Sequence, residues 1–148
     1  RKSVAKGIWV VNEDGPGVWR RGVYSFYKRG MKYPMFEVFD QPDPNVTCER
    51  RAVSTVPTQA LTLLNNEFVV NQARLFAERV HKTAGPEQEA QIRMAYRIAL
   101  SREPLAKEMR SNVEFLNRQR VAHGGSGVKA LADLCDVMLN LNEFLYIN

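Results

Sequence analysis

The sequence EQEAQIRMAYRIALSREPLAKEMRSNVEFL (residues 87–116) carries two consecutive amphipathic helical patterns. Apolar side chains recur in it at intervals of three and four residues, the spacing of one face of an α-helix. The two apolar faces consist of Ile92, Ala95, Tyr96, Ala99 and Leu100, and of Leu105, Met109, Val113 and Leu116. We therefore expect one helix over about residues 87–100 and a second helix that starts at Pro104.

Two more helices are predicted on the N-terminal side of this pair. The first begins at Pro57, because Ser54 or Thr55 can cap it and proline suits a first helical turn. Asn65-Asn66 ends that helix and caps the next, which runs over about residues 67–82. Gly85-Pro86 then separates it from the helix of residues 87–100.

A fifth helix is predicted over about residues 128–140, and the tail from Asn142 to Ile147 is apolar enough to pack back on the bundle. The preceding run Gly124-Gly125-Ser126-Gly127 lacks the Lys-Ser/Thr of a phosphate-binding loop, so we interpret it as a helix connection. The predicted fold class is therefore all-α, a compact bundle of about five helices.

The N-terminal part of the chain is predicted to be an irregular, proline-rich arm. Residues 18–30 place aromatic side chains at helical spacing, so we expect a helix that ends at Gly30. Residues 35–66, called the buckle below, follow it with the sequence MFEVFDQPDPNVTCERRAVSTVPTQALTLLNN. Pro34, Pro42 and Pro44 each disfavour the helical conformation of the residue before them, so residues 33–51 are predicted to be an irregular connection.

The net charge of +5 over 148 residues is unevenly distributed. Residues 1–33 hold eight lysines and arginines against Glu13 and Asp14, a net charge of +6, so the other residues sum to −1. A basic face of this kind either docks on an acidic surface of a preceding domain or binds an anionic polymer, of which nucleic acid is the less favoured case. The candidate basic interface consists of Arg20, Arg21, Lys28, Arg29 and Lys32.

Composition places the chain among ordinary globular domains, with 45% hydrophobic and 25% charged residues. No apolar run approaches the ~20 residues that a membrane-spanning helix needs. The chain starts at Arg1 without a signal-peptide pattern, and we expect it to be a piece of something longer. His81 and His123 share no metal-ligand spacing and no C-x-x-C-H haem motif is present, so neither a metal nor a haem is predicted in it.

The buckle contains the candidate polar cluster, and its acidic residues allow several interpretations. Oxygens of Asp40, Asp43 and Asn45 are suitable Ca²⁺ ligands, but Asp beside Pro more often caps the backbone of a turn. Asp40 with Asp43 or Glu49 is a carboxylate pair of the kind that hydrolyses glycosides, provided that the two flank a cleft. The full candidate cluster consists of Asp40, Asp43, Cys48, Arg50, Arg51, Gln59 and Asn65.

The basic and polar members of this cluster also have structural interpretations. Arg50 and Arg51 either bind a carboxylate or sulfate or form ion pairs inside the buckle, and we favour the ion pairs. Cys48 lacks a nearby base that would make it a nucleophile; Cys48 and Cys135 are either small buried residues or a disulfide pair. Gln59 and Asn65 bracket the helix that starts at Pro57, where capping and loop anchoring explain them without a ligand. No catalytic residue is predicted.

Several separate motifs resemble one family, the planctomycete-specific C-terminal domain of unknown function known as PSD-one. The resemblance covers about residues 15–148, with residues 1–14 as a linker or arm from a preceding domain. The motifs are Trp19-Arg20-Arg21, Phe39-Asp40-x-Pro42-Asp43, Cys48-x-x-Arg51, Ser54-Thr55-x-Pro57-x-Gln59-Ala60-Leu61, Ala95-Tyr96-Arg97-x-Ala99-Leu100-x-Arg102-x-Pro104 and Leu139-Asn140-x-Asn142-Glu143-Phe144-Leu145-Tyr146.

The resemblance implies a context and no chemistry. Such domains end large exported bacterial proteins, follow a companion domain and often accompany a cytochrome c-type haem domain, so a periplasmic or exported location is expected. Our first hypothesis is a non-catalytic helical accessory module that packs on or supports the companion domain. The alternatives are one wall of an active site for acidic or sulfated polysaccharide, built from Asp40, Asp43, Arg50 and Arg51, and a binding module for an anionic polymer.

Overall fold

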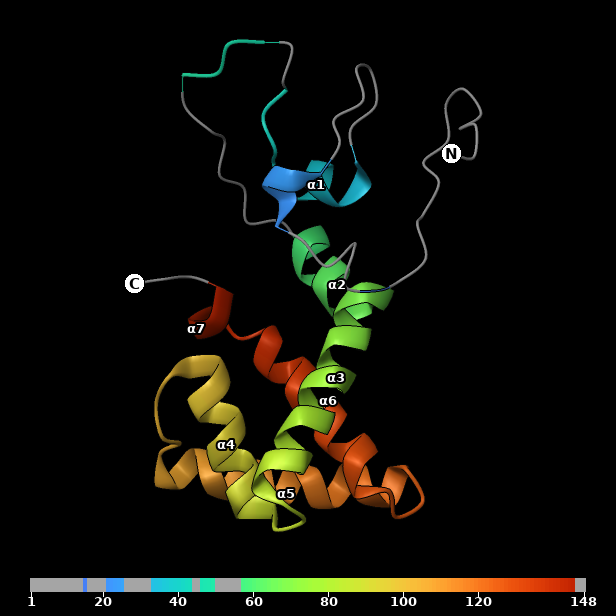
Figure 1. Ribbon diagram of the computed structural model, residues 1–148, viewed down its shortest axis with the longest axis vertical. Coiled ribbons are helices and arrows are strands. Elements are labelled where there is room, and N and C mark those ends of the chain that lie inside the picture. The colour runs from blue at the N-terminus through green and yellow to red at the C-terminus, as the bar shows by residue number, and fades with distance from the viewer. Residues whose placement is uncertain (1–14, 16–20, 26–32, 44–45, 50–56, 146–148) are drawn as a thin grey trace. The chain divides into compact units, whose positions relative to one another are not determined.

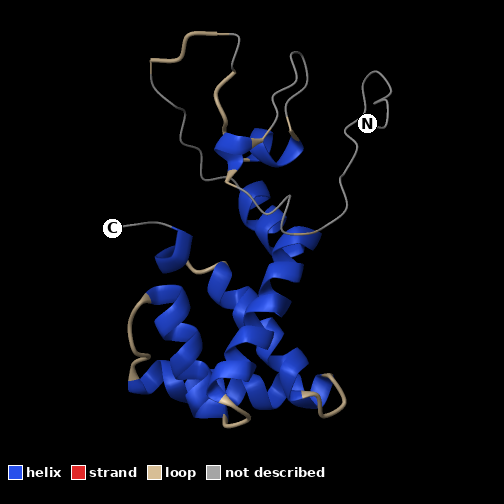
Figure 2. Ribbon diagram, viewed as in Figure 1, coloured by secondary structure: helices blue, strands red, loops and turns tan. Residues whose placement is uncertain are grey.

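The computed structural model describes residues 15, 21–25, 33–43, 46–49 and 57–145. Among these residues the chain is helical and has no β-strand (Figures 1 and 2), which confirms the predicted all-α class. The elements are the 3-10 turn η1 (Gly22–Tyr24), α1 (Pro34–Val38), α2 (Pro57–Asn65), α3 (Glu67–Ala84), α4 (Gln88–Leu100), α5 (Ala106–Ala122), α6 (Gly127–Leu139) and α7 (Asn142–Leu145). None of the described helices is both long enough and apolar enough to span a membrane.

The chain divides into two compact units, Arg1–Gln59 and Ala60–Asn148. The second unit contains helices α3 to α7, and its core is the common interior of α3, α4, α5 and α6. The division of the sequence at residues 14 and 15 stays a prediction.

The core of the second unit is held by apolar side chains from every long helix of the bundle. Helix α6 packs most extensively on α3 and also on α5, while α7 packs on α4 and α6 (Figure 1). The largest fully buried side chains are Val80, Ile92, Leu131, Leu134 and Met138. Burying each of them contributes about 1.5–3 kcal/mol to folding, so apolar packing dominates the stability of this unit.

The ends of these helices follow from local capping. The side chain of Asn66 accepts a hydrogen bond from the backbone N–H of Phe68 at 2.9 Å, which starts α3 as predicted. Glu87 caps α4 through the N–H groups of Glu89 and Ala90. Ser126 accepts from the N–H of Lys129 at the start of α6. The predicted helices of the bundle are therefore confirmed to within about two residues at their ends.

The predicted helix over residues 18–30 is wrong at its described residues. Arg21 and Ser25 have extended backbones, with ψ of 144° and 140°, and only Gly22–Tyr24 form a single 3-10 turn between them. Gly22 also approaches an aromatic residue closely: a Cβ at position 22 would lie 3.0 Å from the ring of Phe36. Glycine, a weak helix former, is therefore present for packing. Residues 18–20 and 26–30 lie outside the described residues.

Among its described residues, the predicted irregular connection of residues 33–51 contains one short helix, α1. Pro34 occupies its first turn, where a missing N–H costs nothing, so proline starts this helix as well as limiting what precedes it. The rings of Tyr33 and Phe36 meet edge to face with centroids 5.2 Å apart. Phe36, Val38 and Phe39 are half-buried.

Candidate functional site

The structure brings two members of the candidate polar cluster together, Asp40 and Gln59. The side-chain amide of Gln59 donates to Oδ2 of Asp40 at 3.1 Å and to the carbonyl oxygen of Val38 at 3.0 Å. Asp40 follows the end of α1 with a φ of 52°, a left-handed conformation that aspartate tolerates better than most residues. Gln59 thus ties the start of α2 to the turn that ends α1, which is an anchoring contact.

For two further members of the cluster, Asp43 and Asn65, the structure describes hydrogen bonds to other partners. The carbonyl oxygen of Asp43 accepts from the N–H of Val46 at 3.2 Å, and both residues are exposed. Asn65 donates to the carbonyl oxygen of Leu61 within its own helix. Cys48 is exposed and Cys135 is fully buried in the core of the bundle, and no disulfide joins them. Arg50 and Arg51 lie outside the described residues.

The candidate basic interface falls mostly outside the described residues, which include only Arg21 of its five members. Arg21 is exposed and precedes the η1 turn. Its companions Arg20, Lys28, Arg29 and Lys32 are not described, so the interface stays a prediction.

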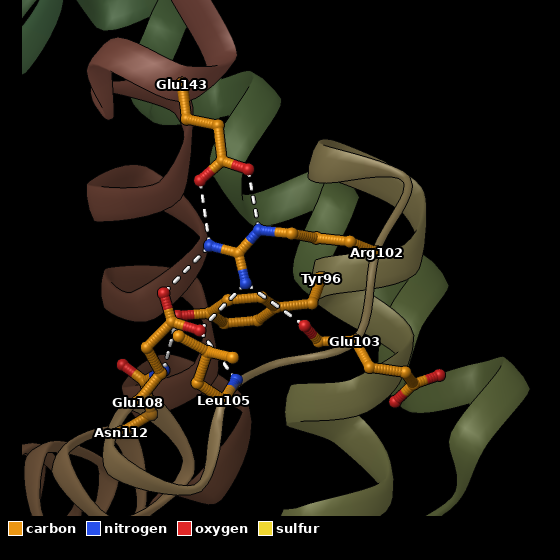
Figure 3. Close-up of polar contacts among 7 residues, drawn as sticks. All are labelled: Tyr96, Arg102, Glu103, Leu105, Glu108, Asn112 and Glu143. Atoms are coloured by element: carbon orange, nitrogen blue, oxygen red, sulfur yellow. Dashed lines mark hydrogen bonds and ion pairs between the residues drawn. The ribbon is translucent and has the colours of Figure 1, made fainter.

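The most highly connected polar centre among the described residues is the Arg102 cluster, which the predicted site residues do not include. Arg102 lies between α4 and α5 and bonds two carboxylates in a forked geometry (Figure 3). Its Nη1 and Nη2 donate to Glu108 at 2.8 Å each, while its Nε and Nη2 donate to Glu143 at 2.6 and 2.8 Å. Nη1 also donates to the carbonyl oxygen of Glu103 at 3.0 Å.

A tyrosine and a helix start complete the Arg102 cluster. The guanidinium stands 5.2 Å from the ring centroid of Tyr96, a cation–π contact, and Asn112 donates to the Tyr96 hydroxyl at 3.0 Å. Oε2 of Glu108 accepts the backbone N–H of Leu105 at 2.7 Å, which caps the start of α5. Leu105 has no side-chain acceptor, so only the glutamate half of a capping box is present.

The electrostatics of the cluster favour its charged forms. The bonds from Arg102 lower the pKa of Glu108 to about 2 against the desolvation that raises it, and they lower the pKa of Glu143 as well. The same bonds raise the pKa of Arg102, while burial raises that of the Tyr96 hydroxyl. Each group therefore stays in one protonation state near neutral pH.

The arrangement leaves Arg102 no donor for a ligand. A guanidinium carries five N–H donors, and five acceptor contacts account for them: two oxygens of Glu108, two of Glu143 and the carbonyl oxygen of Glu103. Arg102 is thus a structural junction that joins the α4–α5 connection, the first turn of α5 and α7. The sequence did indicate the contact between Glu108 and the start of α5, because Glu108 stands at the third position of α5, where a glutamate can cap the helix.

Three smaller polar contacts serve the helix connections of the bundle. The buried amide of Gln91 donates to the carbonyl oxygen of Gly85 at 2.5 Å and bonds Nδ1 of His81 at 3.0 Å. His123 and Asp133 are 2.7 Å apart between the α5–α6 connection and α6. Across the described parts of the chain, no group of three histidine, cysteine, aspartate or glutamate side chains is placed to hold a metal ion.

An apolar row remains exposed on the second unit. The row consists of Leu61 and Leu64 on α2 and Phe68 at the start of α3, beyond the extended Asn66, and each side chain is about half exposed. Helix α2, which carries the two leucines, has no charged residue. A row of this kind on an uncharged helix is typical of a surface that packs against another protein segment.

The model of the family PSD1, described as a protein of unknown function (DUF1553), matches residues 3–116. No curated protein and no solved structure matched the chain.

Proposed function

The chain belongs to the PSD1 family of unknown function, and we propose that it is a non-catalytic helical module of a larger exported protein, which packs on or supports a companion domain. The observation that carries the proposal is the saturation of Arg102. In the Arg102 cluster, all five N–H donors of the guanidinium bond groups of the same helical bundle. An arginine whose five N–H donors are all engaged in this way has none left to bind a substrate.

The apolar row supplies the contact surface that such a module needs. Side chains of Leu61, Leu64 and Phe68 are 56%, 45% and 45% exposed. Covering them with a partner removes apolar area from water, the term that dominates most protein–protein association. We therefore assign Leu61, Leu64 and Phe68 to the face that packs on the companion domain.

Two measurements test this proposal. The chain of residues 1–148 is expected to show no turnover on neutral, acidic or sulfated glycans, and robust turnover by it alone would overturn the non-catalytic assignment. In the full-length protein, Leu64→Glu with Phe68→Glu is expected to increase protease cleavage between the module and the domain before it. Val121→Glu is the matched control, because Val121 is 81% exposed on α5 and away from the row.

A second candidate is that the buckle forms one wall of an active site for acidic or sulfated polysaccharide. The observation that favours it is the left-handed backbone of Asp40, since such strain is common at functional sites. In the full-length protein, Arg51→Ala is then expected to reduce activity on such a polysaccharide at unchanged thermal stability. Loss of both together identifies Arg51 as structural.

A further inference from the structure

The C-terminal helix α7 is too short to hold itself in place. It has four residues, and the N–H groups of Phe144 and Leu145 both donate to the carbonyl oxygen of Leu141 at 3.0 Å, which makes a single turn. One isolated turn is unstable in water, because nucleation fixes several residues for one or two hydrogen bonds. The position of α7 against α4 and α6 therefore depends on contacts made outside the helix itself.

Those outside contacts are partly apolar and partly electrostatic. Phe144 and Leu145 are 42% and 39% exposed, so the apolar contact of α7 is incomplete. Glu143 adds two hydrogen bonds to Arg102, at 2.6 and 2.8 Å, across 41 positions of sequence. This ion pair thus joins α7 to the α4–α5 connection.

The two carboxylates on Arg102 are not equivalent. Glu108 also caps α5 through the N–H of Leu105, so it stays beside Arg102 as long as α5 is folded. Glu143 is the more exposed of the two, and its carboxylate reaches Arg102 only when α7 is docked. When Glu143 leaves, Arg102 keeps both Glu108 oxygens, the Glu103 carbonyl and the Tyr96 ring, and water can reach the donors that Glu143 vacates.

We propose that α7 is a detachable C-terminal strap and that the Arg102–Glu143 ion pair is the latch that holds it against α4 and α6. The asymmetry of the two carboxylates makes the strap open before the rest of the bundle. Opening separates the strap from the faces of α4 and α6 on which it packs and leaves the Nε–Nη2 edge of Arg102 open to solvent. The strap is therefore expected to open in response to lost charge or added salt before the rest of the bundle does.

Hydrogen exchange of the whole chain tests the proposal, because the exchange rates of the Phe144 and Leu145 amides report how often α7 detaches. Glu143→Gln keeps the size of the side chain and removes its charge, so exchange at these two amides is expected to rise severalfold at low salt. Amides of α3 and α6 serve as the internal reference and are expected to keep their protection. Glu114→Gln, an exposed substitution on α5, is the matched control and leaves exchange at α7 unchanged.

Salt provides the second arm of the same experiment. At 1 M salt the screening length falls to about 3 Å, so the native chain is expected to show the fast exchange of Glu143→Gln, and the variant itself to show little further change. Unchanged exchange at Phe144 and Leu145 in Glu143→Gln would overturn the latch. An equal loss of protection in α3 and α6 would overturn the detachable strap, because α7 would then open only with the whole bundle.

Discussion

The two connections that flank α5 hold their helices by different means. Residues 101–105, before α5, are tied by side chains: Arg102 bonds Glu108 and Glu143, while the carboxylate of Glu103 pairs with Arg97. Residues 123–126, after α5, are held mainly by backbone, because the N–H of Gly125 donates to the carbonyl oxygen of Arg120 at 2.8 Å.

The backbones of these connections differ accordingly. Ser101 in the first adopts a left-handed conformation with a φ of 57° although it carries a side chain, which costs about 1 kcal/mol. In the second connection, glycines take the left-handed positions, with φ of 62° at Gly124 and 95° at Gly125. Side-chain hydrogen bonds can thus hold a strained backbone conformation before α5, whereas after α5 glycines adopt the left-handed conformation without that strain.

The largest effect is expected from replacing Arg102, because this removes the side-chain bonds that hold residues 101–105. Arg102→Gln is expected to lower the free energy of unfolding by about 2 kcal/mol after allowance for solvent screening, because it leaves two carboxylates side by side without their cation. Urea denaturation of the chain measures this loss. Arg110→Gln, an exposed arginine on α5, is the control and is expected to change stability by no more than about 0.5 kcal/mol. Equal effects of the two substitutions would show that the connection is not held by its arginine.

Lowering the pH tests the same connection, because it protonates the carboxylate of Glu108. Its pKa in the folded protein, about 2, lies below the ordinary value of 4.5. Its contribution to stability is therefore present above pH 4.5 and is lost as the pH falls toward about 2. Glu108→Gln is expected to cost about 1–2 kcal/mol at pH 7 and to flatten the decline of the urea midpoint over this range. Glu114→Gln is the control and is expected to keep the full acid dependence. If Glu108→Gln also keeps it, other carboxylates cause the decline.

The sequence could predict where the helices lie, but not the side-chain contact that joins distant helices. Helix positions followed from the spacing of Ile92, Ala95 and Tyr96 and from local caps such as Asn66, because both depend on neighbours within one or two turns. The Arg102–Glu143 pair spans 41 positions and depends on how α7 folds back on the bundle. No periodicity contains that information.

The same limit explains the error at residues 21–25. Aromatic spacing around Gly22 resembles a helix, but a Cβ at this position would lie 3.0 Å from the ring of Phe36, fourteen positions away, a contact that local pattern does not reveal. In the buckle, the polarity of Asp40 and Gln59 predicted a contact region, and these two side chains meet. Asn65 donates to the i−4 carbonyl of Leu61 in its own helix.

The backbone of the second connection is tested by giving Gly125 a side chain. Gly125→Ala is expected to cost about 1 kcal/mol, because its φ of 95° is unfavourable for any residue with a Cβ. No atom lies within 4 Å of the added carbon, so the cost is conformational and not a clash. Gly127→Ala is the matched control: it also has open space but lies in the first turn of α6 without a positive φ, so it is expected to be neutral or stabilising. Equal effects at both positions would rule out backbone conformation as the constraint.

The smallest effect is expected at the side-chain contact of this second connection, His123–Asp133. The two side chains are 33% and 38% exposed, so solvent screens their attraction and the pair contributes at most about 0.5 kcal/mol. Asp133 also raises the pKa of Asp136 after the larger effect of burial, and Asp136 has a buried Oδ1 without a hydrogen-bond partner. Asp133→Asn therefore loses one weak attraction and relieves one repulsion, so its unfolding free energy is expected to stay within about 0.5 kcal/mol of the native value. His123→Gln loses only the attraction and is expected to be the less stable of the two variants. If Asp133→Asn instead unfolds as readily as Arg102→Gln, both connections are held by charge, and the distinction between a side-chain tie and a glycine turn fails.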